Sequence, residues 1–387
     1  MVVIAIITLP KMFKGYQQSL DLSLEAAYFY VILPPCLFNL FLGSGEYTIF
    51  LCLFYLWQEA FSRLGQRHQP LQKFETYKPA GFRKITLWII LLLIASTASA
   101  LVPQDSENFN FIGTFGFAVP YGLSLIFFEQ AILCRRKVAV CLLLALQLIP
   151  VVIYVVFFWS GFGRLVIGSY AFMPLLIVNS RYDIGLRARH LALLAPGALA
   201  AAFLSRFKGS DFSRMTDDSG NSHLELTQEM LLSMHQRITP EFSEYFRQWS
   251  LMLLQWVPRD FWPSKPLGLG LSFVKDWWGD IGFAEGHSIA IGFLGEQFWY
   301  LNRLALAGLC FYLMTLVFIR RAITKYSGNS AAPLAAFDAF LPVYIWGGGA
   351  SFGARIWFFV IPMIAALHIL GARRADLQAG NVSQGWR

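Results

Sequence analysis

Charged residues are scarce in this chain of 387 residues. Asp, Glu, Lys and Arg make up 14% of it, whereas hydrophobic residues make up 56%. A water-soluble domain of this length could not bury so much apolar surface. Several apolar runs approach the roughly 20 residues that a helix needs to cross a bilayer. The composition therefore argues against an ordinary soluble enzyme and predicts an all-α polytopic membrane protein.

Cysteine and metal-binding motifs are equally sparse. All five cysteines lie in or beside apolar segments, and no CxxC spacing occurs, so we expect neither disulfides nor a cysteine metal site. No DxD pair is present, and Asp217-Asp218 has no histidine cluster nearby. We therefore expect no metal and no cofactor. The start, MVVIAIITLPKMFKG, is apolar before it is basic and has no cleavage box, so we expect no cleavable signal peptide.

The apolar runs have the lengths and spacing of membrane-spanning helices. Given the ~20 residues that one span needs, we predict about ten of them. They cover residues 24–43, 46–62, 84–103, 110–134, 138–159, 162–179, 189–205, 302–319, 331–347 and 354–371. The glycine-rich stretch GGGASFG, residues 347–353, predicts a break in the helix of the kind that lines a cavity in membrane proteins.

The basic residues predict how these spans are oriented. The net charge of +8 does not form one patch, as a nucleic-acid interface would require. Lys and Arg instead gather in short clusters, at 63–84, 135–137, 181–189, 320–325 and 373–374. With ten spans all these clusters fall on one face, which the positive-inside rule makes cytoplasmic. Both termini are then cytoplasmic.

One long polar loop, residues 206–287, falls on the opposite, outer face. We expect amphipathic helices in it over 222–238 and 240–257, either packed on the protein or lying at the membrane interface. An ordered loop of this length usually carries function. We therefore divide the chain into N-terminal transmembrane helices (1–205), a large outer loop with amphipathic helices and a re-entry segment (206–301), and C-terminal transmembrane helices with a cytoplasmic tail (302–387).

Ionisable residues inside apolar runs are candidate functional residues, because an unpaired charge at membrane depth costs several kcal/mol. Asp338 is expected to pair with Arg355 in a structural ion pair between helices. Arg164, near the outer end of a span, is either a snorkelling arginine or a cation at the rim of an outward cavity. Glu296 is either a structural hydrogen-bonded carboxylate or an acid or base in a cavity.

The segment VPRDFWPSKPLGLGLSF, residues 257–273, places two cations in a stiff, aromatic stretch of the outer loop. Arg259 and Lys265 are separated by Trp262 and Pro263. Arginine forks onto phosphate oxygens and lysine acts as a point charge, so the two together predict an anion site. A lipid-linked diphosphate is the candidate anion, since cations stabilise the charge that grows on a leaving diphosphate. His287, at the end of the loop, is either structural or a further member of the site.

These motifs resemble those of the O-antigen polymerases, the Wzy-type oligosaccharide repeat-unit polymerases. Members show Pro-Arg, then aromatic-Pro-x-Lys-Pro, then Gly-Glu with an aromatic residue and an Asn shortly after. The corresponding residues here are Pro258-Arg259, Trp262 to Pro266, Gly295-Glu296 and Asn302, and Arg164 and Arg237 also stand where such proteins place arginines. One departure follows Asn302, where such polymerases often continue with Phe-Gly and this chain has Arg303.

The resemblance implies a metal-independent, inverting glycosyltransferase with a GT-C-like membrane fold. Its donor would be a glycan on undecaprenyl diphosphate and its acceptor a single repeat unit on the same carrier. The reaction would take place on the periplasmic face of the bacterial inner membrane, with a flippase and a chain-length regulator as partners. Substrate binding is expected from Arg164, Arg237, Arg259 and Lys265, and catalysis from Glu296 or His287, which would orient or deprotonate the acceptor hydroxyl.

Three alternatives remain open. One is a non-catalytic membrane scaffold, against which the grouping of Arg259, Lys265, His287 and Glu296 argues. An O-antigen ligase, which transfers finished glycan to lipid A-core, also has a large periplasmic loop with arginines and a histidine before its last spans. The Trp-Pro-x-Lys-Pro block favours a polymerase over a ligase. A transporter of lipid-linked sugars would carry charges at mid-membrane and show two related halves, and neither is evident in this sequence.

Overall fold

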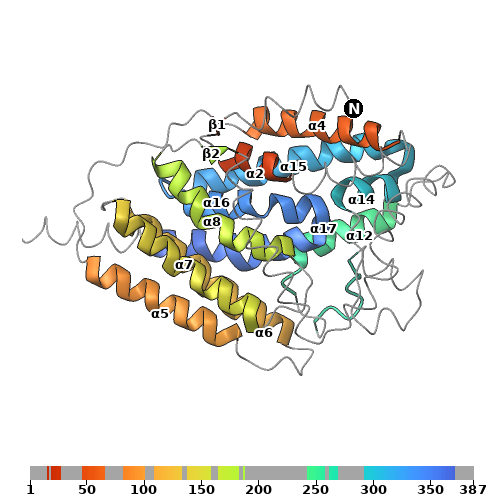
Figure 1. Cartoon of the computed structure of the whole chain (residues 1–387). Coiled ribbons are helices and arrows are strands. Elements are labelled where there is room, and N and C mark those ends of the chain that lie inside the picture. The colour runs from red at the N-terminus through yellow and green to blue at the C-terminus, as the bar shows by residue number, and fades with distance from the viewer. Residues whose placement is uncertain are drawn as a thin grey trace, which may run out of the picture.

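The computed structural model describes residues 15–16, 19–27, 46–65, 82–100, 109–132, 137–157, 164–182, 186–187, 242–257, 261–268 and 292–370. These residues form an all-α bundle (Figure 1). The predicted all-α class is therefore confirmed. Besides turns and the non-helical residues 261–268, the described residues include a short antiparallel pairing of β1 (Gly15–Tyr16) with β2 (Leu186–Arg187), which ties the N-terminal part of the chain to the segment after α8.

Most of the described helices lie where the apolar runs predict them. The run predicted over 24–43 overlaps α2 at residues 24–27, and its remainder lies outside the described residues. The runs predicted separately over 331–347 and 354–371 are joined through α17 and η4. They are α2 (Ser19–Ala27), α4 (Glu46–Gly65), α5 (Phe82–Ala100), α6 (Phe109–Ile132), α7 (Lys137–Phe157), α8 (Arg164–Tyr182), α12 (Phe242–Leu254), α14 (Gly292–Leu301), α15 (Ala305–Tyr326), α16 (Ala332–Ala339) and α17 (Leu341–Arg355). A 3₁₀ turn, η3 (Asn302–Leu304), joins α14 to α15, and a π-helical segment, η4 (Ile356–Val360), continues α17 into helical residues 361–370. The run predicted over 189–205 and the helix predicted over 222–238 lie outside the described residues.

The run predicted as one helix over 331–347 is divided in two. Helix α16 ends at Ala339, and α17 begins at Leu341 with a proline, Pro342, in its first turn. Proline lacks the N–H that would continue the hydrogen-bond ladder of α16, and it suits the start of a helix. The predicted boundary therefore missed a helix end that the proline marks.

Helices α16 and α17 run through the middle of the bundle, with α4 and α15 on one side and α5 and α7 on the other (Figure 1). Nearly every residue of α16 is buried, including its alanines at 332, 335, 336 and 339. Small side chains allow neighbouring helices to approach closely, as they do in membrane proteins. The Ala-rich sequence of α16 thus explains its central position.

The C-terminal ends of four helices meet at one end of the bundle. Arg320 of α15 donates to the carbonyl of Gly65, the last residue of α4, at 2.7 Å. Arg181 of α8 forms a buried ion pair with Glu129 of α6, and Glu129 also accepts the N–H groups of Ala331 and Ala332. Arg320 joins the end of α4 to the C-terminal half of α15, and Glu129 joins the last turns of α6 and α8 to the start of α16.

A proline-induced gap in α8 is filled by a neighbouring tyrosine. Pro174 has no N–H, so the carbonyl of Tyr170, four residues earlier, loses its helical partner. The hydroxyl of Tyr121 in α6 donates to that carbonyl at 2.9 Å. Such repair by a neighbouring helix is how prolines are tolerated inside membrane helices.

Large apolar side chains remain exposed along the outer helices. They include Leu87, Trp88 and Ile94 on α5, Leu142 and Val152 on α7, and Met314 and Phe318 on α15, with exposed fractions from 54% to 73%. The helical run from Gly295 to Tyr326 is long and apolar enough to cross a membrane, and it is the one such run among the described residues; shorter apolar helices lie at 84–99, 116–132, 139–153, 332–345 and 356–370. The number of spans and their orientation stay predictions.

Candidate functional site

The glycine-rich stretch predicted to interrupt a helix does so. Gly348 has φ 76° and ψ −175°, a conformation outside the helical region in the middle of α17. Glycine is the residue that adopts positive φ without steric cost, since it has no Cβ. The break releases the N–H of Gly349 from the hydrogen bond that a continuous helix would give it. A free backbone donor therefore points away from α17 inside the bundle.

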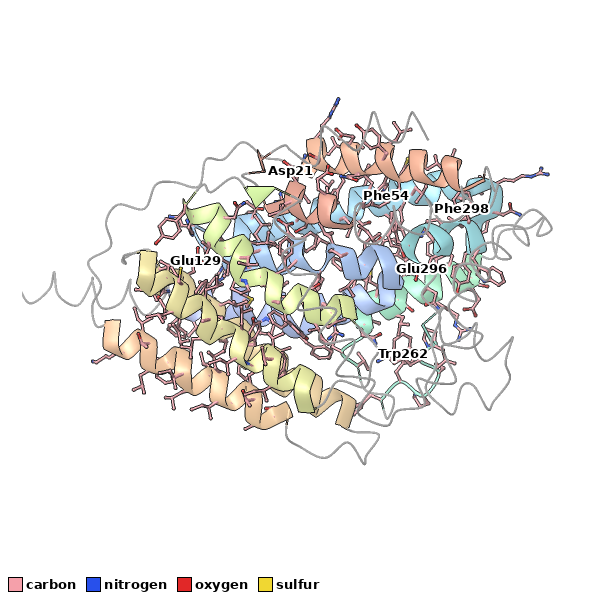
Figure 2. All side chains as sticks on the ribbon, in the orientation of Figure 1. Asp21, Phe54, Glu129, Trp262, Glu296 and Phe298 are labelled. Atoms are coloured by element: carbon pink, nitrogen blue, oxygen red, sulfur yellow. The ribbon has the colours of Figure 1, made fainter. Side chains whose placement is uncertain are left out.

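The carboxylate of Glu296 accepts that donor. Glu296 lies on α14 and is 5% exposed, and its two oxygens lie 3.2 and 3.1 Å from the nitrogen of Gly349. The hydroxyl of Tyr312 donates to the same carboxylate at 3.4 Å. A Cβ on Gly348 would lie 2.0 Å from Glu296 Oε1, so the side chain of residue 348 must be absent for Glu296 to fit. Figure 2 shows Glu296 where α14, α12 and α17 meet.

A bend between α14 and α15 brings Glu296 to Tyr312. The two residues are 16 positions apart, which a straight helix would separate by about 24 Å. Asn302, at the start of η3, has φ 45°, a left-handed conformation that asparagine adopts more readily than most residues. Because the chain turns there, α14 packs back against α15, and Gly308 of α15 lies against Gln297 of α14. Asn302, which the sequence analysis grouped with Glu296, thus shapes the site.

Helix α12, from the loop predicted to lie on the outer face, covers these groups. A Cβ on Gly353 of α17 would lie 2.2 Å from the carbonyl oxygen of Met252, so the two helices touch along their backbones. The hydroxyl of Tyr245 donates to Gln297 Oε1 at 2.9 Å. Burial raises the pKa of Tyr245, and the carboxylate of Glu296 raises it further, so the hydroxyl keeps its proton at neutral pH.

The helix predicted over 240–257 is confirmed and found at 242–254, and it has apolar groups on both sides. Tyr245, Trp249 and Met252 are among its buried residues, whereas Phe246 and Leu253 are among its exposed ones. It therefore packs on α14 and α17 and also presents an apolar outer face.

Tyr344 of α17 completes the aromatic wall beside Glu296. Its ring lies against the rings of Tyr312 and Phe293, with centroids 5.7 and 5.2 Å apart. It is fully buried, and among the described residues its hydroxyl has no hydrogen-bond partner. The sequence analysis missed Tyr245, Tyr312 and Tyr344, because nothing in their spacing from Glu296 indicates that they meet. The glycine-rich break was the signal that could have pointed to Tyr344.

Lys265, predicted to bind substrate, fastens its own segment to α12. Its ammonium donates to the carbonyls of Gln255 and Val257 at 2.8 and 2.9 Å, just after the C-terminal end of α12. Gln248 of α12 donates to the carbonyl of Leu267 at 2.8 Å. Cations are favoured at the C-terminal end of a helix, where carbonyl groups lack partners. The Trp-Pro-x-Lys-Pro block is thereby joined to the helix that covers Glu296.

The other predicted site residues lie elsewhere in the chain. Arg164 is the first residue of α8, at the opposite end of that helix from Arg181. Arg237, Arg259 and His287 lie outside the described residues. The structure thus brings the Lys265 and Glu296 motifs together through α12.

The predicted partner of Asp338 is wrong. Asp338 forms a bidentate ion pair with Arg320 of α15, at 2.9 and 3.1 Å, and both side chains are buried. Arg355 is the last residue of α17, a whole helix beyond α16, where Asp338 lies. Charge type and sequence proximity favoured Arg355, whereas helix packing selected a residue from the preceding helix. As predicted, the pair joins two helices.

Within the described ranges, no three His, Cys, Asp or Glu side chains are grouped closely enough to hold a metal ion. The groups that surround Glu296 are instead tyrosine hydroxyls, a backbone N–H and an amide. Such a site can bind a polar neutral group and accept a proton from it.

No family model matches the sequence, and no curated protein or solved structure is similar to it.

Proposed function

We propose that the protein is a polytopic glycosyltransferase of the bacterial inner membrane that polymerises oligosaccharide repeat units carried on undecaprenyl diphosphate. Its product is O-antigen or a related surface polysaccharide. The observation that carries the proposal is the assembly of Glu296, α12 and the Lys265 segment into one unit. These are the parts of the chain in which the sequence resembles the O-antigen polymerases.

The exposed apolar faces of α5, α7 and α15 support a position in the membrane. Large apolar patches on a protein surface mark contacts with other molecules or with lipid. The basic residues support an orientation of the bundle. Arg181 contacts Glu129 and Arg320 contacts Gly65, and both contacts lie at the same end of the bundle. Figure 2 shows Glu129 well separated from Glu296. With the basic end cytoplasmic, Glu296 and α12 lie toward the periplasm.

The reaction that fits these groups is an inverting displacement. The acceptor hydroxyl attacks the anomeric carbon of the donor sugar, the new glycosidic C–O bond forms, and the bond to the diphosphate breaks. Glu296 accepts the proton of the attacking hydroxyl. Arg164, Arg237 and Arg259 balance the charge that grows on the departing diphosphate, in the role that arginines play at leaving phosphates.

In this scheme Lys265 stabilises the fold, whereas its sequence motif predicts that it binds the diphosphate. Both carbonyls that it contacts belong to the segment directly after α12, so its charge stabilises a helix end. We propose that Lys265 positions the segment that carries Arg259. The arginines are then left to bind the diphosphate.

The test is made in the native host. The gene is deleted and complemented with wild type, Glu296→Gln or Glu59→Gln, the last being a change of a partly exposed carboxylate on α4. Membrane levels are matched, and extracted lipopolysaccharide or capsule is run on a gel. We expect the deletion and Glu296→Gln strains to carry a single repeat unit on the core, and Glu59→Gln to restore long chains.

Other results would support other functions. Long chains that accumulate on the lipid carrier without reaching the core would indicate a ligase. Normal long chains in the deletion strain would refute both glycosyltransferase functions.

A further inference from the structure

The hydroxyl of Tyr344 is the strongest unexplained feature near Glu296. The side chain has no exposed surface, and among the described residues no group hydrogen bonds to the hydroxyl. Burying an unpaired hydroxyl is unfavourable, and phenylalanine would fill the same space without that cost. The packing of α17 therefore explains the ring of Tyr344 but does not explain its oxygen.

The ring of Tyr344 lies in the cluster around a carboxylate whose hydrogen bonds are long. The ring of Tyr344 stacks on that of Tyr312, with centroids 5.7 Å apart, and the hydroxyl of Tyr312 donates to Glu296, so Tyr344 belongs to the same cluster as the carboxylate. The contacts of Glu296 with Gly349 and Tyr312 measure 3.1 to 3.4 Å. Hydrogen bonds to an ionised carboxylate are usually 2.9 Å or shorter. Glu296 therefore has capacity for a stronger donor, and Tyr344 has a donor without an acceptor.

A single alcohol group satisfies both residues. An alcohol donates one hydrogen bond, which Glu296 accepts, and its oxygen accepts hydrogen bonds, one of which Tyr344 supplies. The rings of Tyr312, Tyr344 and Phe293 provide the apolar wall that binding sites place around a few polar groups. The cluster suits a sugar hydroxyl better than an anion, since a carboxylate already occupies its centre.

We infer that Tyr344 binds the attacking hydroxyl of the acceptor sugar, holding its oxygen while Glu296 accepts its proton. This inference rests on the proposed polymerase function, and it names the acceptor subsite of that site. Glu296 lies in α14 and Tyr344 in the first half of α17, and no sequence pattern indicates that these segments meet. The break at Gly348 lets them face one ligand.

The acceptor requires a path to this subsite, and we expect a displacement of α12 to supply it. Helix α12 covers the cluster and is held by the contact of Met252 with Gly353 and by the hydrogen bond from Tyr245 to Gln297. Both contacts are between α12 and the helices beneath it. We expect displacement of α12 from α17 to open the cluster to the acceptor.

The test compares two tyrosine-to-phenylalanine variants of the full-length protein. Tyr344→Phe removes a hydroxyl that has no partner, whereas the control, Tyr121→Phe, removes one that donates to the Tyr170 carbonyl. Each protein is purified in lipid nanodiscs. Its thermal unfolding is measured, and so is its polymerisation rate against the concentration of lipid-linked repeat unit extracted from the deletion strain.

Tyr344→Phe is expected to unfold at the wild-type temperature or above and to need about tenfold more repeat unit for half-maximal rate, as loss of one hydrogen bond to substrate would cause. Tyr121→Phe is expected to unfold at a lower temperature and to keep the wild-type dependence on repeat unit. Wild-type kinetics for Tyr344→Phe would overturn the inference and leave the polymerase function standing. A lower unfolding temperature for Tyr344→Phe would overturn it too, because the hydroxyl would then have a structural partner. Absence of polymerisation by the wild type would overturn the proposed function and the inference with it.

Discussion

The backbone N–H of Gly349 donates to both carboxylate oxygens of Glu296, at 3.2 and 3.1 Å, across the break in helix α17. The carboxylate of Glu296 in α14 thus accepts a backbone N–H of α17 that the break at Gly348 leaves without its helical partner. The arrangement requires a residue without a Cβ at position 348, because Glu296 Oε1 fills the space that a Cβ would take. The site therefore depends jointly on a glycine and a glutamate 52 positions apart.

Alanine at position 348 is expected to disrupt the site. The backbone conformation at Gly348, φ 76° and ψ −175°, is essentially restricted to glycine and costs alanine roughly 1–3 kcal/mol, and the added Cβ overlaps Glu296. We expect Gly348→Ala to lower thermal stability in detergent and to abolish polymer formation on the gel. Gly168→Ala is the matched control, since a Cβ there meets nothing within 4 Å, and a glycine-to-alanine change in a helix stabilises it by about 0.5–1 kcal/mol. Equal stability and activity of Gly348→Ala and wild type would contradict the geometry described for α17.

Breaking the buried pair between Arg320 and Asp338 is expected to destabilise the bundle strongly. Removing one partner leaves an uncompensated buried charge, which costs about 3–5 kcal/mol. Asp338→Ala should therefore lower the unfolding temperature by far more than Glu59→Ala, which breaks an exposed pair with Arg63 worth less than about 1 kcal/mol. The double change Arg320→Met with Asp338→Leu should recover part of the loss. A double variant no more stable than Asp338→Ala would show that the remaining arginine is not the cause.

Lys265→Met separates a positioning role from substrate binding. Loss of two charged hydrogen bonds to the end of α12 is expected to lower stability by about 1.5–3 kcal/mol, measured by thermal unfolding without substrate. Arg247→Met, on the exposed side of the same helix, should change stability by less than about 0.5 kcal/mol. If Lys265→Met unfolds like wild type and instead needs more repeat unit, Lys265 contacts the substrate directly.

A cross-link can test whether α12 moves during the reaction. The rings of Trp256, just after α12, and Trp357, in η4, are 5.8 Å apart. With the five native cysteines replaced, Trp256→Cys and Trp357→Cys should be joined by a short thiol-specific reagent. We expect the joined protein to lose polymerisation while keeping its unfolding temperature, and the variant with Trp256→Cys alone to be unaffected by the reagent. Full activity of the joined protein would show that the acceptor reaches Glu296 without displacement of α12.

Local sequence patterns were enough to predict most helices. Apolar runs of span length predicted α4 to α8 and α15, because apolar side chains exclude water from the backbone and a helix then satisfies its polar groups internally. The amphipathic pattern over 240–257 predicted α12, and the glycine-rich stretch at 347–353 predicted the break in α17. These signals are contained in neighbouring residues. The helix end before Pro342 was also visible locally and was missed.

Long-range contacts were beyond such patterns. Glu296 was recognised as a candidate because a carboxylate in an apolar run is unusual. The bend at Asn302 and the packing of α12 selected its partners, Tyr312 and Gly349. The pairing of Asp338 with Arg320, and the attachment of Lys265 to the end of α12, were decided in the same way.

By itself, therefore, the sequence determined the helical class, the positions of most helices and the residue at the centre of the candidate site. Tertiary structure decided which groups surround that residue and which cation serves the fold. The physical reason is range: hydrophobic periodicity and backbone conformation act over a few residues. The contacts of a buried carboxylate depend on how helices far apart in the chain cross and pack.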